Sequence, residues 1–334
     1  MTVTTREIHL AARPTGVPAR SDFRLAETVL PAPAEGEVLV RNTWMSVDPY
    51  MRGRMDDAPS YIPPFALDAP LEGSAVGEVI ASRAEGVPVG TLVSHFAGWR
   101  EHALLPATAV FPIDATGIPA EHFLGVLGTT GLTAWAALTD AAPVKEGDTV
   151  FVSAAAGAVG SVAGQLARRY GAARVIGSAG GPDKGARAVR DFGYDIALDY
   201  RAGDLAGQLE RAAPEGIDVY VDHVGGDHLE AAIGALRPGG RIALVGAISS
   251  YNDTEPAPGP ANLFRLAALG ASVKGVLVNH YLDRFGEWIG EAAPLLAEGS
   301  LRGTSTVLNG LEKAPEAFLG VLSGANVGKM LVRL

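Results

Sequence analysis

A turn of small residues carries the clearest chemical signal in this 334-residue chain. The turn, Ala154–Gly160, follows an apolar run that predicts a buried parallel strand, and it precedes a predicted helix over Ser161–Tyr170. Small side chains let the backbone approach a ligand closely, and the free N–H groups and dipole of a helix N-terminus attract an anion. The strand, the turn and the helix together predict a site for the pyrophosphate of a dinucleotide.

The end of the next predicted strand indicates which dinucleotide binds. In an NAD site, a carboxylate about 20 residues after the glycines binds the 2′-hydroxyl of the adenosine ribose. This chain has Gly177–Gly181 (GSAGG) at that place, without an acid, and Lys184 and Arg187 follow. A cation without a competing carboxylate suits a 2′-phosphate, so the sequence favours NADP over NAD. The alternative is that Lys184 simply lies on a surface helix.

The segment Val47–Met55 (VDPYMRGRM) holds a second group of polar side chains. Its members that could do chemistry are Asp48, Tyr50, Arg52 and Arg54. Composition alone favours a solvated loop with a structural tyrosine. Other polar aromatic residues of this region receive the same structural interpretation, because such residues in a β-rich domain usually pack with one satisfied hydrogen bond. They are Tyr61, His95, Trp99 and His102.

Two patterns of hydrophobic residues predict two domains, and the chain is also long for one hydrophobic core. Up to about residue 120, short alternating strands lie between Pro and Gly turns, as in a barrel or a sandwich. These strands are predicted at Glu37–Val47, Leu71–Ala81 and Gly90–His95. A helical pattern follows over Leu124–Leu138.

From Asp148 onward, predicted strands alternate with helices, which is typical of a doubly wound parallel sheet. The strands are predicted at Val150–Ser153, Arg174–Gly177, Ile196–Asp199, Val219–Asp222, Arg241–Gly246 and Ser272–Val278. Further helical spacing covers Asp183–Phe192 and Gly203–Ala212. The pattern becomes irregular after Gly299 and ends with a helix, Leu311–Ser323, and a strand, Lys329–Leu334. We expect this last strand to return to the first domain.

Composition excludes several classes of protein. Hydrophobic residues make up 48% and charged residues 19% of the chain, which indicates a globular fold, and a net charge of −10 argues against nucleic-acid binding. The absence of cysteine excludes disulfides and thiolate zinc sites, and the scattered histidines suggest no metal site. The N-terminus lacks the apolar core of a signal peptide, and the uncharged stretch Thr149–Ala167 is mostly Ala, Gly and Ser rather than a membrane span. We therefore expect a cytoplasmic protein without membrane contact.

The motifs, taken in order, resemble one family along nearly the whole chain. It is the zinc-independent medium-chain dehydrogenase/reductases, in the NADP-dependent alkenal/enone reductase branch with leukotriene B4 12-hydroxydehydrogenases and plant double-bond reductases. The segments that carry the resemblance are SVDPYMR (46–52), GLTAW (131–135), AAAGAVGS (154–161), VGG (224–226), GAISSYN (246–252) and NVGK (326–329). The resemblance implies an α/β protein. A GroES-like β-rich domain (1–123 and 300–334) would join a Rossmann doubly wound parallel-sheet domain (124–299), with the active site in the cleft between them.

The resemblance also implies roles by matched position. Tyr50 and Tyr251 correspond to tyrosines beside the nicotinamide and the substrate carbonyl, and are the expected catalytic residues. Ala158–Ser161 would hold the pyrophosphate of NADP(H), whereas Lys184 and Tyr200 would contact its 2′-phosphate. The full set of expected cofactor contacts is Ala158, Val159, Gly160, Ser161, Lys184, Tyr200, His223, Val245, Gly246, Ala247, Ile248, Ser249, Ser250, Val276, Leu277, Val278 and Asn326.

Two positions depart from the pattern of the family. His223 stands where the family usually has Asn, and Thr129-Thr130 replaces its usual Met-Pro. We expect the first to alter a ribose or amide contact of the cofactor and the second to reshape the substrate pocket. The substrate range of the family therefore does not carry over to this chain.

The expected reaction is NADPH-dependent reduction of a carbon–carbon double bond conjugated to a carbonyl in a small molecule. Hydride transfer to the β-carbon generates an enolate, and Tyr50 and Tyr251 are the candidate donors to its oxygen, with a ribose hydroxyl as a third. The α-carbon proton would come from tyrosine or water. Two alternatives remain open at this point, a quinone reductase of the same superfamily and a non-catalytic NADPH-binding protein. The resemblance further implies a homodimer.

Overall fold

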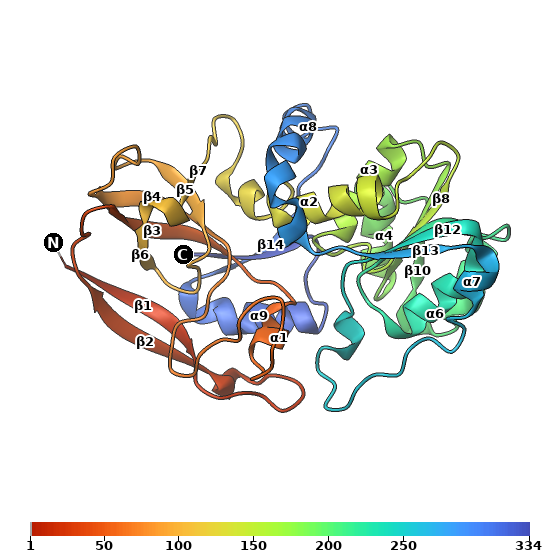
Figure 1. The fold of residues 1–334 in the computed structure, drawn as a ribbon, viewed down its shortest axis with the longest axis horizontal. Coiled ribbons are helices and arrows are strands. Elements are labelled where there is room, and N and C mark those ends of the chain that lie inside the picture. Colours follow the sequence, from red (N-terminus) through yellow and green to blue (C-terminus); the bar gives the residue numbers. More distant parts are fainter. Residues whose placement is uncertain (1) are drawn as a thin grey trace. The chain divides into compact units, whose positions relative to one another are not determined.

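The computed structural model describes residues 2–334, and these divide into two compact units (Figure 1). The β-rich unit comprises the chain up to Leu124 together with Ser305–Leu334, and the α/β unit comprises Gly125–Thr304. The second boundary thus lies five residues after the predicted one. The added segment is tied to the α/β unit, where the Gln165 side chain accepts the Arg302 N–H at 2.8 Å and donates to the Arg302 carbonyl at 3.1 Å.

A seven-stranded sheet forms the frame of the β-rich unit. Its order is β14-β15-β3-β4-β5-β7, with β6 paired to β3, and a hairpin of β1 and β2 stands apart from it. The strands are β1 (Val3–Leu10), β2 (Phe23–Leu30), β3 (Glu37–Ser46), β4 (Ala75–Ser82), β5 (Leu92–His95), β6 (His102–Pro106), β7 (Phe111–Pro112), β14 (Ser305–Asn309) and β15 (Lys329–Arg333). The helices are α1 (Met51–Arg54) and α9 (Ala314–Leu322). As expected, the last strand returns to this unit, where it pairs with β3.

Aromatic packing holds α9 and the hairpin together. The buried Trp99 ring stacks on Phe23 of β2 at 6.1 Å, and Phe318 of α9 meets Trp99 edge-on at 6.2 Å. His95 is also buried, with Nε2 2.8 Å from the Asn42 side chain, and burial lowers its pKa to about 4. The structural interpretation of His95 is therefore confirmed. Trp99 also packs in the core, but its Nε1–H has no hydrogen-bond partner within residues 2–334.

The α/β unit is a parallel sheet of order β10-β9-β8-β11-β12-β13. This is the 3-2-1-4-5-6 order of a Rossmann fold, with the crevice for a ligand where the order reverses, between β8 and β11. The strands are β8 (Thr149–Val152), β9 (Arg174–Ala179), β10 (Ile196–Asp199), β11 (Ile217–Asp222), β12 (Leu236–Leu244) and β13 (Ser272–Gly275). The helices are α2 (Thr129–Ala136), α3 (Gly160–Arg169), α4 (Pro182–Asp191), α5 (Leu205–Ala212), α6 (Gly226–Ala235), α7 (Arg265–Leu269) and α8 (Phe285–Ala297). The predicted fold class is confirmed.

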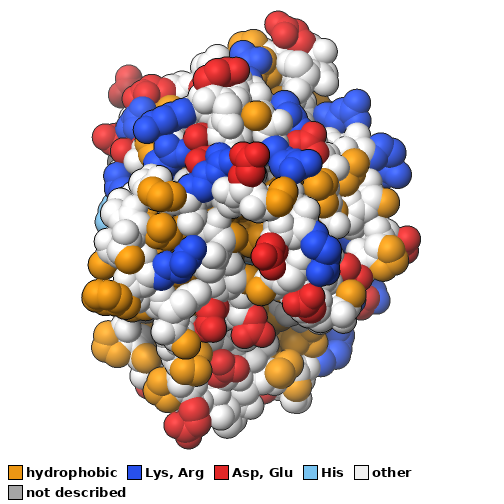
Figure 2. All heavy atoms as spheres, turned by 90° about the vertical axis from the view of Figure 1, so that its right-hand side faces the viewer, with side chains coloured by type: hydrophobic (Ala, Val, Ile, Leu, Met, Phe, Trp, Pro, Cys, Tyr) orange, Lys and Arg blue, Asp and Glu red, His pale blue; other side chains and the backbone are white. Residues whose placement is uncertain are grey.

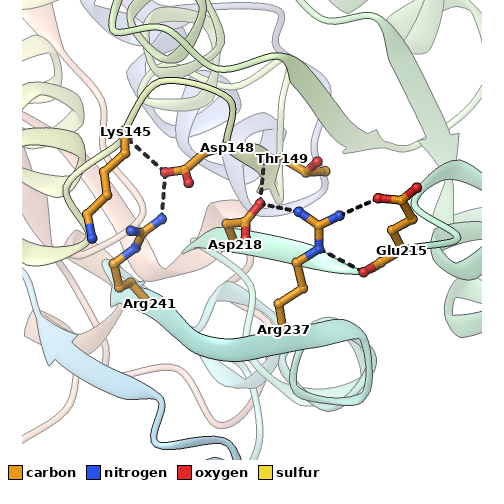
Figure 3. Close-up of polar contacts among 7 residues, drawn as sticks. All are labelled: Lys145, Asp148, Thr149, Glu215, Asp218, Arg237 and Arg241. Carbon is orange, nitrogen blue, oxygen red and sulfur yellow. Dashed lines mark hydrogen bonds and ion pairs between the residues drawn. The ribbon is translucent and has the colours of Figure 1, made fainter.

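Charged side chains join the amino-terminal ends of the central strands (Figure 3). Arg241 of β12 pairs at 2.5 Å with Asp148, which precedes β8, and both side chains are nearly buried. Arg237 bridges Asp218 of β11 and Glu215 at 3.0 and 2.8 Å. These contacts occupy the amino edge of the sheet and leave its carboxyl edge for a ligand, as in other open α/β sheets.

No helix within residues 2–334 is long and apolar enough to cross a membrane. The uncharged stretch that begins at Thr149 consists of strand β8, the following turn and helix α3. Its apolar side chains fill the core of the α/β unit, which explains why the stretch carries no charge.

Candidate nucleotide and substrate sites

The turn after β8 is shaped for the close approach of a ligand. Ala154 adopts a positive φ of 50°, and its carbonyl accepts the Gly157 N–H at 2.8 Å. A Cβ atom on Gly160 would lie only 2.3 Å from the Ala154 carbonyl oxygen, so only glycine lets α3 begin directly against the strand. The predicted residues Ala158–Ser161 therefore lie together at a helix N-terminus, where backbone N–H groups can hold a phosphate.

Three side chains converge beyond the end of β9. A Cβ atom on Gly180 would lie 2.8 Å from both the Tyr200 hydroxyl and Arg201 Nε. Lys184 stands in the first turn of α4, and its pKa is lowered by burial and then by the positive charge of Arg201. Two cations and a hydroxyl at one place suit a dianionic phosphate. The structure thus brings the predicted Lys184 and Tyr200 together.

Arg201 is a residue that the sequence reasoning missed. It follows Tyr200 directly, so a basic residue beside a predicted phosphate contact was the available signal. Arg187, by contrast, turns to Asp191 of its own helix, with Nε 3.1 Å from the carboxylate. The chain therefore presents Arg201, and not Arg187, as the second cation beside Lys184.

The turn after β11 brings His223 against the end of β8. Its Nδ1 lies 2.7 Å from the Ser153 carbonyl oxygen, and its backbone N–H donates to Ser153 Oγ at 2.9 Å. A carbonyl oxygen can only accept, so Nδ1 carries the proton and Nε2 presents a lone pair, in the neutral form that burial favours by lowering the pKa. The family's usual Asn can both donate and accept, whereas this ring offers an acceptor.

The carboxyl edge carries buried polar atoms that have no hydrogen-bond partner within the described residues 2–334. They are Ser178 Oγ, Asp222 Oδ2, His223 Nε2 and His228 Nε2. Unpaired polar atoms are costly in a protein interior, and a ligand rich in hydroxyl and amide groups supplies partners of the right kind. Together with the glycine turn and the cationic cluster, the residues present fit NADP(H).

A loop after β12 carries the second predicted tyrosine. Ser249 donates both its backbone N–H and its hydroxyl to the Val224 carbonyl, at 3.2 and 2.5 Å, which folds the loop over the turn after β11. The Tyr251 hydroxyl accepts the Ala247 N–H at 3.4 Å, and burial raises the pKa of Tyr251. The predicted residues Val245–Ser250 thus share a loop with Tyr251, and Val276–Val278 follow directly on β13.

Tyr50 lies in the β-rich unit, at the start of α1. Burial, and next the negative charge of Asp48, raise the pKa of Tyr50 well above its ordinary value of 10.0, so the phenol stays protonated. Asn326 is in the same unit, where its side chain donates to the Gly328 carbonyl at 2.7 Å. The other predicted site residues all belong to the α/β unit.

The expectation that a solvated loop surrounds Tyr50 is wrong. Arg52 and Arg54 are buried, and each donates to a main-chain carbonyl: Arg52 to Gly16 at 3.0 Å and Arg54 to Pro63 at 2.9 Å. The Arg54 guanidinium also lies 4.0 Å from the centre of the Phe65 ring. Carbonyls, a ring and the carboxylates of Asp56 and Glu72 replace water around these charges, which composition cannot reveal.

Thr129 and Thr130, which replace the family's usual Met-Pro, lie in the α/β unit at the start of α2. The Thr130 hydroxyl donates to the Gly125 carbonyl at 2.9 Å and so closes the preceding turn. A Cβ atom on Gly131 would come within 1.8 Å of the Val126 carbonyl oxygen, which explains the glycine of the GLTAW motif. Thr130 therefore has a structural use here.

The donor set does not fit a zinc site. The chain contains no cysteine, and no group of three or more His, Asp or Glu side chains within residues 2–334 is arranged to hold a metal ion. A catalytic zinc needs three protein ligands.

Comparison with known proteins identifies the family. The family described as "N-terminal domain of oxidoreductase" matches residues 6–113, and "Zinc-binding dehydrogenase" matches residues 158–298. An NADPH-dependent curcumin reductase of Escherichia coli is 38% identical over 97% of this chain and 95% of its own length. An NADP(+)-dependent 2-alkenal reductase of Nicotiana tabacum is 37% identical over 99% of this chain and 97% of its own length.

A solved structure agrees with these relatives. The crystal structure of CurA from Vibrio vulnificus in complex with NADPH is 39% identical, covers 98% of both chains and superposes with a TM-score of 0.93. The similarity spans both units and includes the segments around the two predicted tyrosines. The chain belongs to the zinc-independent medium-chain dehydrogenase/reductases, in the NADP-dependent alkenal/enone reductase branch.

Proposed function

We propose that this protein reduces the carbon–carbon double bond of α,β-unsaturated aldehydes and ketones with NADPH. The observation that carries the proposal is that both predicted tyrosines are half-buried, and that desolvation raises the pKa of each above its ordinary value. A neutral phenol can donate a hydrogen bond to a carbonyl oxygen on which negative charge develops. The names of the curcumin and 2-alkenal reductases support the same reaction class.

Each part of the chain has a separate task in this reaction. NADPH, when bound, supplies the hydride that adds to the β-carbon of the substrate. The turn at Ala158–Ser161 holds the pyrophosphate, and Lys184, Tyr200 and Arg201 hold the 2′-phosphate. Tyr50 and Tyr251 donate to the carbonyl oxygen, which lowers the energy of the enolate. A proton from tyrosine or water then reaches the α-carbon, so the substrate gains one hydride and one proton.

The decisive test is the loss of absorbance at 340 nm with NADPH, and separately with NADH, over a panel of alkenals, enones and quinones. We expect rapid NADPH oxidation with enones and a saturated carbonyl as the product. Turnover of quinones alone would assign the protein to the quinone reductases of the superfamily. NADPH binding without turnover on the whole panel would favour a non-catalytic role.

We also propose that two copies pair through strand β13. This edge strand exposes all four of its residues, and nearby Leu263 and Phe264 are 55% and 85% exposed. Figure 2 views the side on which β13 and α7 lie in Figure 1, and it shows hydrophobic patches between charged groups. A free strand edge beside exposed apolar side chains favours pairing with an identical edge.

A charge on this edge should separate the copies. We expect Val273→Glu to convert a dimer into a monomer in light scattering coupled to size-exclusion chromatography. Val307→Glu is the matched control, because Val307 is an exposed valine on the edge strand β14 of the other sheet. A wild-type monomer, or dissociation by the control alone, would overturn this assembly.

A further inference from the structure

The β-rich unit contains a buried ion pair, between Lys329 and Asp48, that is separate from the residues given a role in the reaction. Lys329 is 3% exposed and Asp48 is 9% exposed. Lys329 Nζ lies 2.5 Å from Asp48 Oδ1 and donates to the Val47 carbonyl at 3.0 Å. The other carboxylate oxygen, Asp48 Oδ2, accepts the hydroxyl of the buried Ser46. Both oxygens of the carboxylate are thus engaged by the protein.

The register of the sheet places these two residues opposite each other. In the antiparallel pair of β15 with β3, Leu331 stands opposite Ser46, and the Val47 N–H donates to the Met330 carbonyl at 3.3 Å. Continuing the same register, Lys329 faces Asp48. The ion pair therefore closes the ladder at the point where β3 ends and the chain turns toward Tyr50.

From Asp48 to Tyr50 the backbone has little freedom. The Asp48 carbonyl accepts the Met51 N–H at 3.2 Å, and the Pro49 carbonyl accepts the Arg52 N–H at 3.0 Å. Pro49 also restricts φ between the two residues. Anchoring the Asp48 carboxylate therefore anchors the start of α1, where Tyr50 stands.

Net stabilisation is a weak reason for such a pair. Burying two charges costs desolvation that their attraction about balances, so an apolar pair would hold the sheet as well. A charge pair differs from an apolar one in its directionality, since it fixes the carboxylate in one orientation. Because Asp48 stands two residues before Tyr50, a fixed carboxylate also fixes the backbone that carries Tyr50.

We propose that the Lys329–Asp48 pair positions Tyr50, so that the last strand of the chain sets the geometry of the hydrogen bond to the substrate carbonyl. Lys329 and Asp48 act through Tyr50 and touch neither substrate nor cofactor. The catalytic part of this inference rests on the proposed function, whereas the anchoring of the loop does not.

The test compares Lys329→Met, Asp48→Asn and the double variant. We expect each single variant to lower kcat for an enone on the order of 10- to 100-fold, because small misplacements of a catalytic group have such effects. The dissociation constant of NADPH should change much less. The double variant should regain melting temperature, because no unpaired charge remains buried, but it should not regain kcat. If kcat returned together with stability, the pair would be structural only.

Arg241→Met is the matched control, because it also breaks a nearly buried ion pair with a 2.5 Å contact, at the amino edge of the other unit (Figure 3). It should lower the melting temperature and leave kcat unchanged.

Amide hydrogen exchange provides a readout that needs no turnover. Lys329→Met should speed exchange in the peptide 46–55, and Arg241→Met should not. Unchanged exchange in this peptide would overturn the proposal. If the wild type reduced no enone, the proposed function would fail, and the exchange result alone would decide whether the pair anchors Tyr50.

Discussion

Tyr50→Phe and Tyr251→Phe should each lower kcat for enone reduction on the order of 10²- to 10³-fold, the usual effect of removing one donor to a developing oxyanion. Each substitution deletes one hydroxyl and keeps the ring, so packing changes little. Because burial raises both pKa values, the phenols should remain donors, and kcat should not fall from tyrosine ionisation up to about pH 9. Steady-state kinetics between pH 6 and 9, with enone and NADPH varied separately, measure both effects.

Tyr170→Phe is the control for these variants. Its hydroxyl donates to Glu291 at 2.8 Å within the α/β unit, so its loss should cost about 1 kcal/mol of stability and no catalysis. NADPH affinity should survive in Tyr50→Phe, as measured by quenching of protein fluorescence. Wild-type kcat in both tyrosine variants would remove the two tyrosines from the proposed chemistry.

Lys184→Ala and Arg201→Ala should each weaken NADPH binding by roughly 10- to 100-fold, since a charge-assisted hydrogen bond contributes about 1.5–3 kcal/mol. NADH lacks the 2′-phosphate, so kcat/KM with NADH should hardly change. The double variant should therefore lose most of the preference for NADPH. The ratio of kcat/KM for the two cofactors is the quantity to measure.

Arg187→Ala tests whether position, rather than net charge, produces this preference. The substitution also removes one positive charge from α4, but its guanidinium pairs with Asp191. We expect a wild-type cofactor ratio. A ratio that dropped equally in Arg187→Ala and Arg201→Ala would mean that a diffuse field, and not a phosphate site beside Gly180, discriminates the cofactors.

Local sequence patterns sufficed for much of the α/β unit. The predicted strands in this unit are present, because buried parallel strands are continuous apolar runs that stand out between glycine turns. Errors lie at the ends: β12 begins at Leu236, five residues before the prediction, and β13 ends at Gly275 rather than Val278. The hairpin of β1 and β2 and the strand β14 were missed. β2 exposes half of its residues, and β1 buries the polar Thr5 and Glu7, so neither strand shows a clear hydrophobic periodicity.

The sequence by itself determined the glycine turn, the lack of an acid after β9 and the two tyrosines, since each depends on residue types at short spacing. Only the tertiary structure decided which distant groups meet. It brought Arg201 to Gly180, buried Arg52 and Arg54 against carbonyls, and set Lys329 opposite Asp48. These contacts depend on strand register and on loop packing, which connect residues up to 281 positions apart and leave no local periodicity in the chain.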